Sequence, residues 1–111
     1  MEEIWRWPAT EVARAVKEGE IRSREAVDAS LRRLETVEPF INAFSDLAEG
    51  ALDRADAADA AKAQGDDLGP LHGVPIGFKD SHEIAGRATV AGMPAFARMP
   101  VATETCPQAS R

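Results

Sequence analysis

The sequence predicts an α/β fold in which N-terminal helices precede the first strands of a larger mixed sheet. Three segments between residues 10 and 63 have the apolar spacing of amphipathic helices. After them, Val74, Ile76 and Phe78 alternate with other residues, as the side chains of a strand do. We therefore expect a helical part over residues 1–65 and a strand-and-loop part over residues 66–111, both belonging to one domain.

The first helix is expected to begin at Thr10 and to end at Gly19. Threonine is a favoured N-cap residue, and glycine commonly follows the last turn of a helix. Val12 and Val16 lie one turn apart between these two residues. This spacing places both valines on one face, which we expect to be buried.

The second helix is expected to begin at Ser23 and to stop at Pro39. Glu25 would lie in the first turn, where the helix dipole favours a negative charge, and proline disrupts a helix because it has no N–H to donate. Apolar residues recur with helical spacing between these ends, and the predicted buried stripe consists of Val27, Leu31 and Leu34.

The third helix is expected to begin at Asp46, because Asp46 followed by Glu49 has the spacing of a capping box. It is rich in alanine, the best helix former. Asp53, Asp56 and Asp59 would lie on one face. We interpret them as a solvated face and not as a metal site, because no ligand-loop pattern is present.

Composition and charge exclude several classes of function. The net charge is −6 and the isoelectric point is about 4.9, which argues against direct binding to nucleic acid. No apolar run approaches the ~18 residues that span a membrane, and the start lacks the pattern of a secretory signal. The single cysteine, Cys106, fits a reducing compartment. We expect a cytoplasmic protein with a thin, alanine-rich core.

The segment over residues 69–80, GPLHGVPIGFKD, is the part of the chain that indicates chemistry. Lys79 ends a short apolar run between glycines and prolines, so we expect its amine to be partly withdrawn from water. Such a lysine can lose its proton near neutral pH and act as a base. The residues alone leave a surface lysine at a strand end as the alternative. His72 is expected to make a structural hydrogen bond, and Asp80 to steady the loop.

This segment resembles the amidase signature family, which includes bacterial amidases, the A subunit of the glutamyl-tRNA amidotransferase and fatty acid amide hydrolases. The later residues 85–86, 89–92 and 102–104 are similar to its following segments. The resemblance implies a Ser–cis-Ser–Lys mechanism with Lys79 as the base, a small-molecule amide as substrate, and neither a cofactor nor a metal. It is compatible with a homodimer.

In that family both serines come from a loop rich in glycine and serine that lies downstream of the matched segments. Ser81 and Ser110 do not lie in such a loop. Thr105, Pro107 and Gln108 predict the start of a helix that the chain does not complete. We therefore expect an N-terminal fragment of an amidase, inactive alone. A non-catalytic binding or assembly module, or an inactive remnant, stays open as the alternative.

Overall fold

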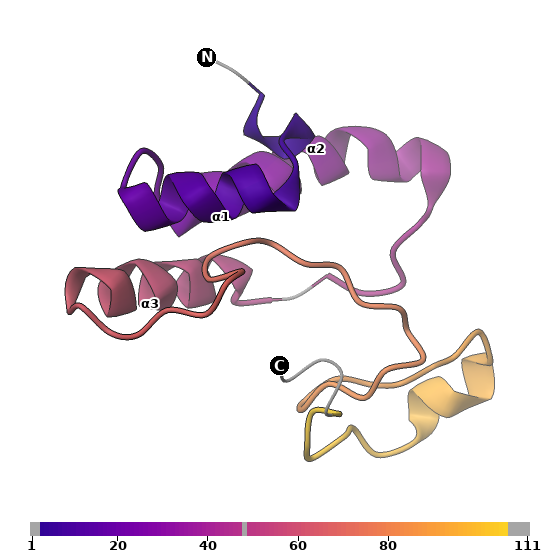
Figure 1. Cartoon of the computed structure of the whole chain (residues 1–111). Helices are drawn as coiled ribbons and strands as arrows, with labels where there is room; N and C mark the ends of the chain where they lie inside the picture. Colours follow the sequence, from indigo (N-terminus) through magenta and orange to yellow (C-terminus); the bar gives the residue numbers. More distant parts are fainter. Residues whose placement is uncertain (1–2, 48, 107–111) are drawn as a thin grey trace. The chain divides into compact units, whose positions relative to one another are not determined.

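The computed structural model describes residues 3–47 and 49–106, and the predicted helix start over residues 105–108 lies mostly outside them. The chain divides into two compact units, Met1–Pro75 and Ile76–Arg111. The first unit holds most of the helical structure, and the second holds one short helix (Figure 1). In chain order the elements are η1 (Ile4–Arg6), α1 (Ala9–Glu18), α2 (Ser23–Ile41), α3 (Ala51–Ala63) and η2 (Pro94–Arg98).

Helix α1 begins before Thr10, so the predicted start at that residue is wrong. Pro8 occupies the N-cap position, and its carbonyl accepts the N–H groups of Glu11 and Val12 at 3.0 Å each. Thr10 therefore lies within the first turn of the helix and is not its N-cap. The predicted end at Gly19 is confirmed, because Gly19 has a φ of 78° and follows the last helical residue.

Helix α2 begins at Ser23 as predicted and continues through Pro39, so the expected stop at Pro39 is wrong. Glu25 Oε2 accepts the N–H of Arg22 at 2.7 Å and closes the first turn. Pro39 lies in the last turn, where its missing N–H costs the helix a single bond. The helix ends at Ile41, and the next residue, Asn42, takes a φ of 45° and donates its N–H to the carbonyl of Glu38 at 2.8 Å.

The core of the first unit lies where α1 packs on α2. Val12 and Val16 are buried there as predicted, together with Ala26. Of the predicted stripe on α2, Val27 is buried, whereas Leu31 and Leu34 are only half-buried. Small side chains dominate this core, which confirms the expectation of a thin one. The partly buried residues that pack against it are Ile4, Trp7, Ile21 and Val74.

Helix α3 begins at Ala51, five residues after the expected start at Asp46. Gly50 immediately precedes it with a φ of 80°, and a left-handed residue cannot continue a right-handed helix. The helix packs against α2. One of its aspartates, Asp59, accepts the N–H of Ser23 at 2.6 Å and the N–H of Arg24 at 3.1 Å. Asp59 thereby caps α2 from a neighbouring helix.

The expected solvated face of α3 is therefore only partly correct. Asp53 is exposed, but Asp56 forms an ion pair with Arg24 and Asp59 is half-buried at the start of α2. Both contacts join residues more than thirty positions apart. The helical periodicity placed these aspartates on one face, but it could not show that another helix would use that face.

The predicted strand over Val74, Ile76 and Phe78 is wrong for this chain. Residues 74–79 form neither helix nor strand, and the described residues contain no strand at all. A strand exists only where a neighbouring strand satisfies its backbone N–H and C=O groups. No such neighbour is present among the described residues. Residues 3–47 and 49–106 thus form helices, turns and loops, and they do not show the strands of the predicted α/β class.

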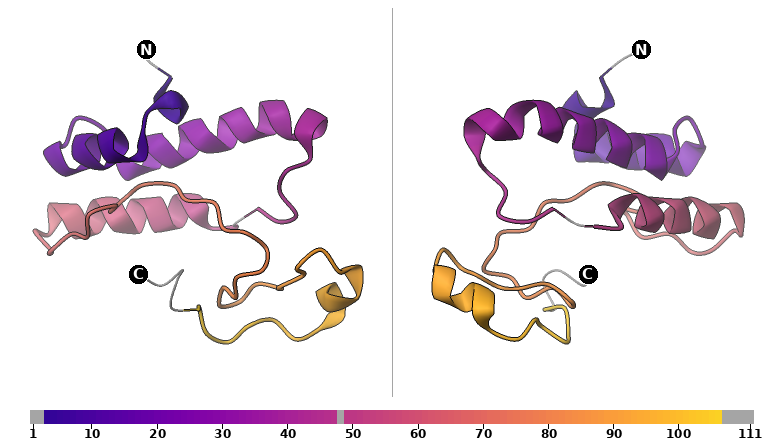
Figure 2. Two further views of the ribbon diagram at one scale, coloured as in Figure 1. Left: turned by 45° about the vertical axis from the view of Figure 1, so that its right-hand side comes forward. Right: turned by 180° about the vertical axis from the view of Figure 1, so that it is seen from behind.

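The segment after α3 turns back and passes between the helices of the first unit (Figures 1 and 2). Ser23 is 1% exposed, and its hydroxyl donates to the carbonyl of Gly73 at 2.8 Å. Gly73 has a φ of 80°, and a Cβ built there would lie 3.0 Å from both Ser23 Cβ and Val16 Cγ1. Both the backbone conformation and the close packing therefore require glycine at position 73.

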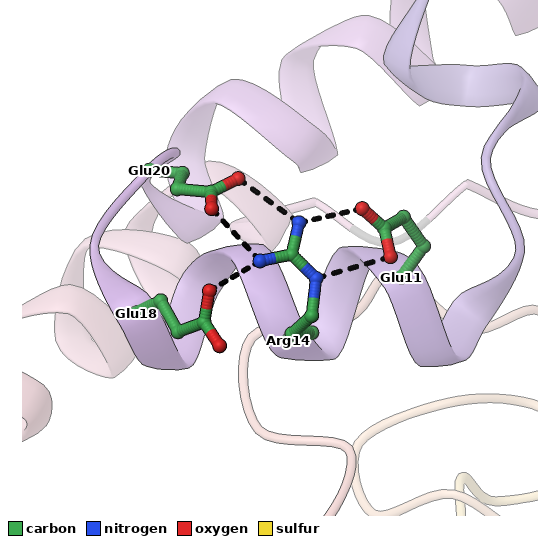
Figure 3. Close-up of polar contacts among 4 residues, drawn as sticks. All are labelled: Glu11, Arg14, Glu18 and Glu20. Carbon is green, nitrogen blue, oxygen red and sulfur yellow. Dashed lines mark hydrogen bonds and ion pairs between the residues drawn. The ribbon is translucent and has the colours of Figure 1, made fainter.

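A cluster of four charged residues fixes the connection between α1 and α2 (Figure 3). The guanidinium of Arg14 donates to Glu11 at 2.6 Å, to Glu20 at 2.8 Å and to Glu18. Glu20 lies in the short connection, so its contact ties this loop back to α1. The hydrogen bonds from Arg14 hold the pKa of Glu11 and the pKa of Glu20 below the usual value for a glutamate.

Replacing Gly73 by alanine should destabilise the chain by about 2–4 kcal/mol, through left-handed strain and overpacking against Val16 and Ser23. The matched control is Gly65→Ala, at a φ of 78° with open space around the added Cβ, which should cost about 1 kcal/mol. Urea unfolding followed by circular dichroism measures both variants. Equal losses of stability would contradict the close packing at Gly73.

The Arg14 cluster should make stability fall in acid. Because the folded-state pKa values of Glu11 and Glu20 are lowered, their contribution is complete above the usual glutamate pKa of 4.5 and is lost as the pH falls through the lowered values. Melting temperatures of wild type and Arg14→Gln, measured across this range, should converge at low pH. The exposed Arg32→Gln serves as control, and an Arg14→Gln difference that does not depend on pH would refute this account.

Candidate active site

The first half of the segment 69–80 belongs to the first unit and is held by α2 and α3. His72 Nε2 lies 2.8 Å from the carbonyl oxygen of Ala58 in α3. A carbonyl only accepts, so Nε2 carries the proton in this contact. The turn is closed by the N–H of His72, which donates to Gly69, and by the N–H of Val74, which donates to Leu71, both at 3.2 Å. The structural role predicted for His72 is confirmed.

Lys79, the predicted base, lies in the second unit and is exposed. The expected withdrawal of its amine from water is therefore not provided by this chain. Over residues 3–47 and 49–106, the amine of Lys79 forms no ion pair or hydrogen bond, and the ring Nδ1 of His82 contacts only the backbone carbonyl of Lys79, at 3.4 Å. Ser81 is also exposed and makes no hydrogen bond to the amine. The structure thus presents the lysine without a hydroxyl partner among its described residues.

Backbone contacts define the path of the chain around Lys79. The carbonyl of Lys79 accepts the N–H of His82 at 3.0 Å, and the carbonyl of Asp80 accepts the N–H of Ala91 at 3.1 Å. The carboxylate of Asp80 accepts a further N–H, that of Val90, at 3.2 Å. Residues 79–80 are therefore joined to the turn at 90–92 by main-chain and side-chain bonds. The steadying role expected of Asp80 thus has a partner that the sequence did not indicate.

Elsewhere in the second unit, hydrogen bonds pair residues 83–87 with residues 102–106. The N–H of Gly86 donates to the carbonyl of Ala102 at 2.8 Å, and the N–H of Ala102 donates to the carbonyl of Arg87 at 3.2 Å. Two further hydrogen bonds extend this pairing. The N–H of Cys106 donates to the carbonyl of Glu83 at 2.9 Å, and Thr105 Oγ1 accepts the N–H of Ala85 at 3.1 Å. Gly86 and Gly92 both lie in turns and have positive φ.

The second unit exposes many large apolar side chains for its size. Its exposed apolar residues are Ile76, Phe78, Met93, Phe96, Met99 and Val101, each between 39% and 61% accessible. None of the apolar side chains among its described residues is buried. This part of the chain therefore has no buried apolar core of its own within the described residues.

Two other kinds of site are not seen in the described part of the chain. Within residues 3–47 and 49–106, His, Cys, Asp and Glu side chains do not gather in threes as a bound metal ion would require. The helices in the same residues are too short or too polar to cross a lipid bilayer.

Several proteins of known sequence are similar to most of this chain. Indoleacetamide hydrolase from Bradyrhizobium diazoefficiens is 43% identical over 93 residues, which cover 83% of this chain and 18% of that protein. The A subunit of glutamyl-tRNA(Gln) amidotransferase from Streptomyces coelicolor is 37% identical over 93 residues, covering 83% and 19%. The corresponding protein from Synechococcus sp. CC9902 is 45% identical over 67 residues, covering 60% and 14%. The chain spans less than a fifth of each relative.

The fold also matches a solved structure. A chain from a vestigial protein complex, described as revealing the evolutionary origins of an s-triazine catabolic enzyme, aligns with a TM-score of 0.84 at 29% identity. The alignment covers 89% of this chain and 22% of that one. In addition, the model of the Amidase family matches residues 25–105, which include most of α2, all of α3 and the whole segment 69–80. Because this match covers most of the chain, the protein belongs to the amidase family.

Proposed function

We propose that this chain is the N-terminal part of an amidase that hydrolyses carboxamide C–N bonds, with Lys79 as the general base. The observation that carries the proposal is the match of the Amidase family model to residues 25–105, which includes Lys79 and the residues around it. Two relatives with different printed activities, a hydrolase of indoleacetamide and an amidotransferase, share this part of the chain. Their common chemistry is the breaking of an amide bond.

In the proposed mechanism the neutral amine of Lys79 receives a proton through the hydroxyl of a bridging serine. That relay deprotonates a second serine, whose oxygen attacks the amide carbon. The C–N bond breaks, the departing nitrogen takes up the proton, and an acyl ester remains on the enzyme. Water then attacks the ester and releases the carboxylic acid, while backbone N–H groups stabilise the oxyanion in both steps. The two serines would be supplied by the rest of the domain.

The exposed apolar side chains of the second unit support the proposal that this chain is part of a larger amidase domain. Its six exposed apolar side chains would be covered by the remainder of an amidase domain, and the same cover would withdraw Lys79 from water. Residues 74–79 would find strand neighbours there and give the mixed sheet of an α/β fold. The relatives, of which this chain spans 14–19%, have the length that such a domain requires.

The substrate is proposed to be a small carboxamide, and the enzyme to act in the cytoplasm without a metal or cofactor. The lone cysteine and the acidic balance support a reducing compartment and argue against direct contact with nucleic acid. Homodimerisation of the parent stays a prediction, which gel filtration of the complete protein checks.

Lys79→Ala should lower amide hydrolysis by about 10²–10⁴-fold in the protein made from the complete reading frame that contains this segment, because a positioned base contributes that much. Ammonia release from indole-3-acetamide and other primary carboxamides measures the loss. Lys17→Ala, at an exposed position on α1, is the matched control and should retain wild-type rates.

The 111-residue chain alone should release no ammonia above background, because no serine among residues 3–47 and 49–106 is hydrogen-bonded to the proposed base. Near-normal turnover by the Lys79→Ala variant would contradict the proposal that Lys79 is the general base. A reading frame without a loop rich in glycine and serine would overturn the proposal in favour of a non-catalytic module.

A further inference from the structure

The residue after Lys79, Asp80, opposes the role proposed for the lysine as a base. Asp80 carries a carboxylate, and a carboxylate beside an ammonium favours the charged form of the lysine. A base must give up that proton before it can work. An amidase that uses Lys79 therefore needs Asp80 to be engaged elsewhere.

In the structure the carboxylate of Asp80 is hydrogen-bonded to the backbone of the turn at 90–92. Asp80 is half-buried, and its Oδ1 accepts the N–H of Val90 at 3.2 Å. No ion pair joins Asp80 to Lys79 or to any other cation among residues 3–47 and 49–106. A hydrogen bond from a backbone N–H to a carboxylate is charge-assisted and stronger than a neutral one. The negative charge of Asp80 is thus directed towards the turn at 90–92.

A second bond strengthens the contact between Asp80 and this turn. The carbonyl of Asp80 accepts the N–H of Ala91 at 3.1 Å, so Asp80 binds two consecutive amides. Ala91 has a φ of 49°, a left-handed conformation that is unfavourable for alanine. Such a conformation persists only where its surroundings hold it, and the two bonds to Asp80 are contacts that hold it here.

We propose that Asp80 is a positioning residue for the amidase reaction: it fixes the backbone of Lys79 against residues 90–92 and keeps its own carboxylate away from the amine. The inference rests on the proposed function. It gives a role to the acidic residue, to Val90 and to the strained Ala91, which the mechanism otherwise leaves unused.

Asparagine and alanine at position 80 separate the two parts of this role. The Oδ1 atom of asparagine still accepts the N–H of Val90, whereas alanine removes the acceptor. In the complete enzyme, Asp80→Ala should lower kcat about 10-fold or more with little change in KM, since misplacing a catalytic group costs rate. Asp80→Asn should restore most of kcat, and the acid limb of its pH–kcat profile should coincide with that of wild type.

The matched control is Glu83→Gln, which removes an exposed charge from the same unit without touching Val90. A fall in kcat for Asp80→Asn equal to that for Asp80→Ala would overturn the positioning role. An acid limb displaced to lower pH in Asp80→Asn would show direct pairing with Lys79 and would also overturn it.

A measurement on the 111-residue chain tests the contact without amidase activity. The Val90 amide signal in NMR should move as the Asp80 carboxylate titrates, and Asp80→Asn should abolish this movement. In Asp80→Ala, the Val90 and Ala91 amides should exchange with solvent several-fold faster than in wild type. Unchanged exchange would refute the proposal even if the complete enzyme is an amidase, whereas an inactive complete enzyme would refute the proposed function.

Discussion

The hydrogen bond from the Ser23 hydroxyl to the Gly73 carbonyl is the contact on which the first unit depends. Ser23 is almost fully buried at the start of α2, and both its hydroxyl and its N–H are satisfied, by Gly73 and by Asp59. An unmade bond at such a site costs more than an ordinary one contributes. The same residue therefore starts a helix, receives a cap from α3 and anchors the segment that returns between the helices.

This arrangement explains why a chain with a small core has defined structure in its first unit. Alanine-rich faces bury little apolar area, so the polar contacts carry an unusual share of specificity. Asp59 joins α3 to α2, His72 joins the returning segment to α3, and Arg14 joins the α1–α2 connection to α1. Each of these contacts fixes one element relative to another without requiring a large buried side chain.

Local signals in the sequence predicted the helical elements and their faces. Ser23 as a start, Gly19 as an end and the burial of Val12 and Val16 follow from capping preferences and periodicity. The errors arise where local signals compete. Pro39 stands too near the helix end to stop it, and the positive φ of Gly50 overrides the capping pattern at Asp46.

The family was predicted from the segment 69–80, and the family match confirms it. The role of Lys79 as the base stays a prediction, and the contacts around it were not predicted. The hydrogen bonds that the Ser23 N–H donates to Asp59 and that the Val90 N–H donates to Asp80 join residues 36 and 10 positions apart. No periodicity in the sequence specifies such pairs. The expected strand and the expected desolvation of Lys79 require neighbours that the described residues do not provide.

The two units thus have different roles in the proposed enzyme. The helical unit holds the first half of the segment 69–80 through Gly73 and His72. The second unit carries the lysine, the turn that binds Asp80, and an apolar surface suited to burial against other protein. In an amidase, the catalytic lysine would then stand on a backbone fixed from within this part of the chain, while its partners come from elsewhere.

Amide hydrogen exchange in Ser23→Ala, followed residue by residue, tests the central claim most directly. The Ser23 hydroxyl anchors the returning segment, so its removal should accelerate exchange of the His72 and Val74 amides while the Glu25 and Ala26 amides of α2, bonded to Arg22, stay protected. Exchange at His72 and Val74 that matches wild type would show that the segment is held by something other than Ser23, and would contradict the account.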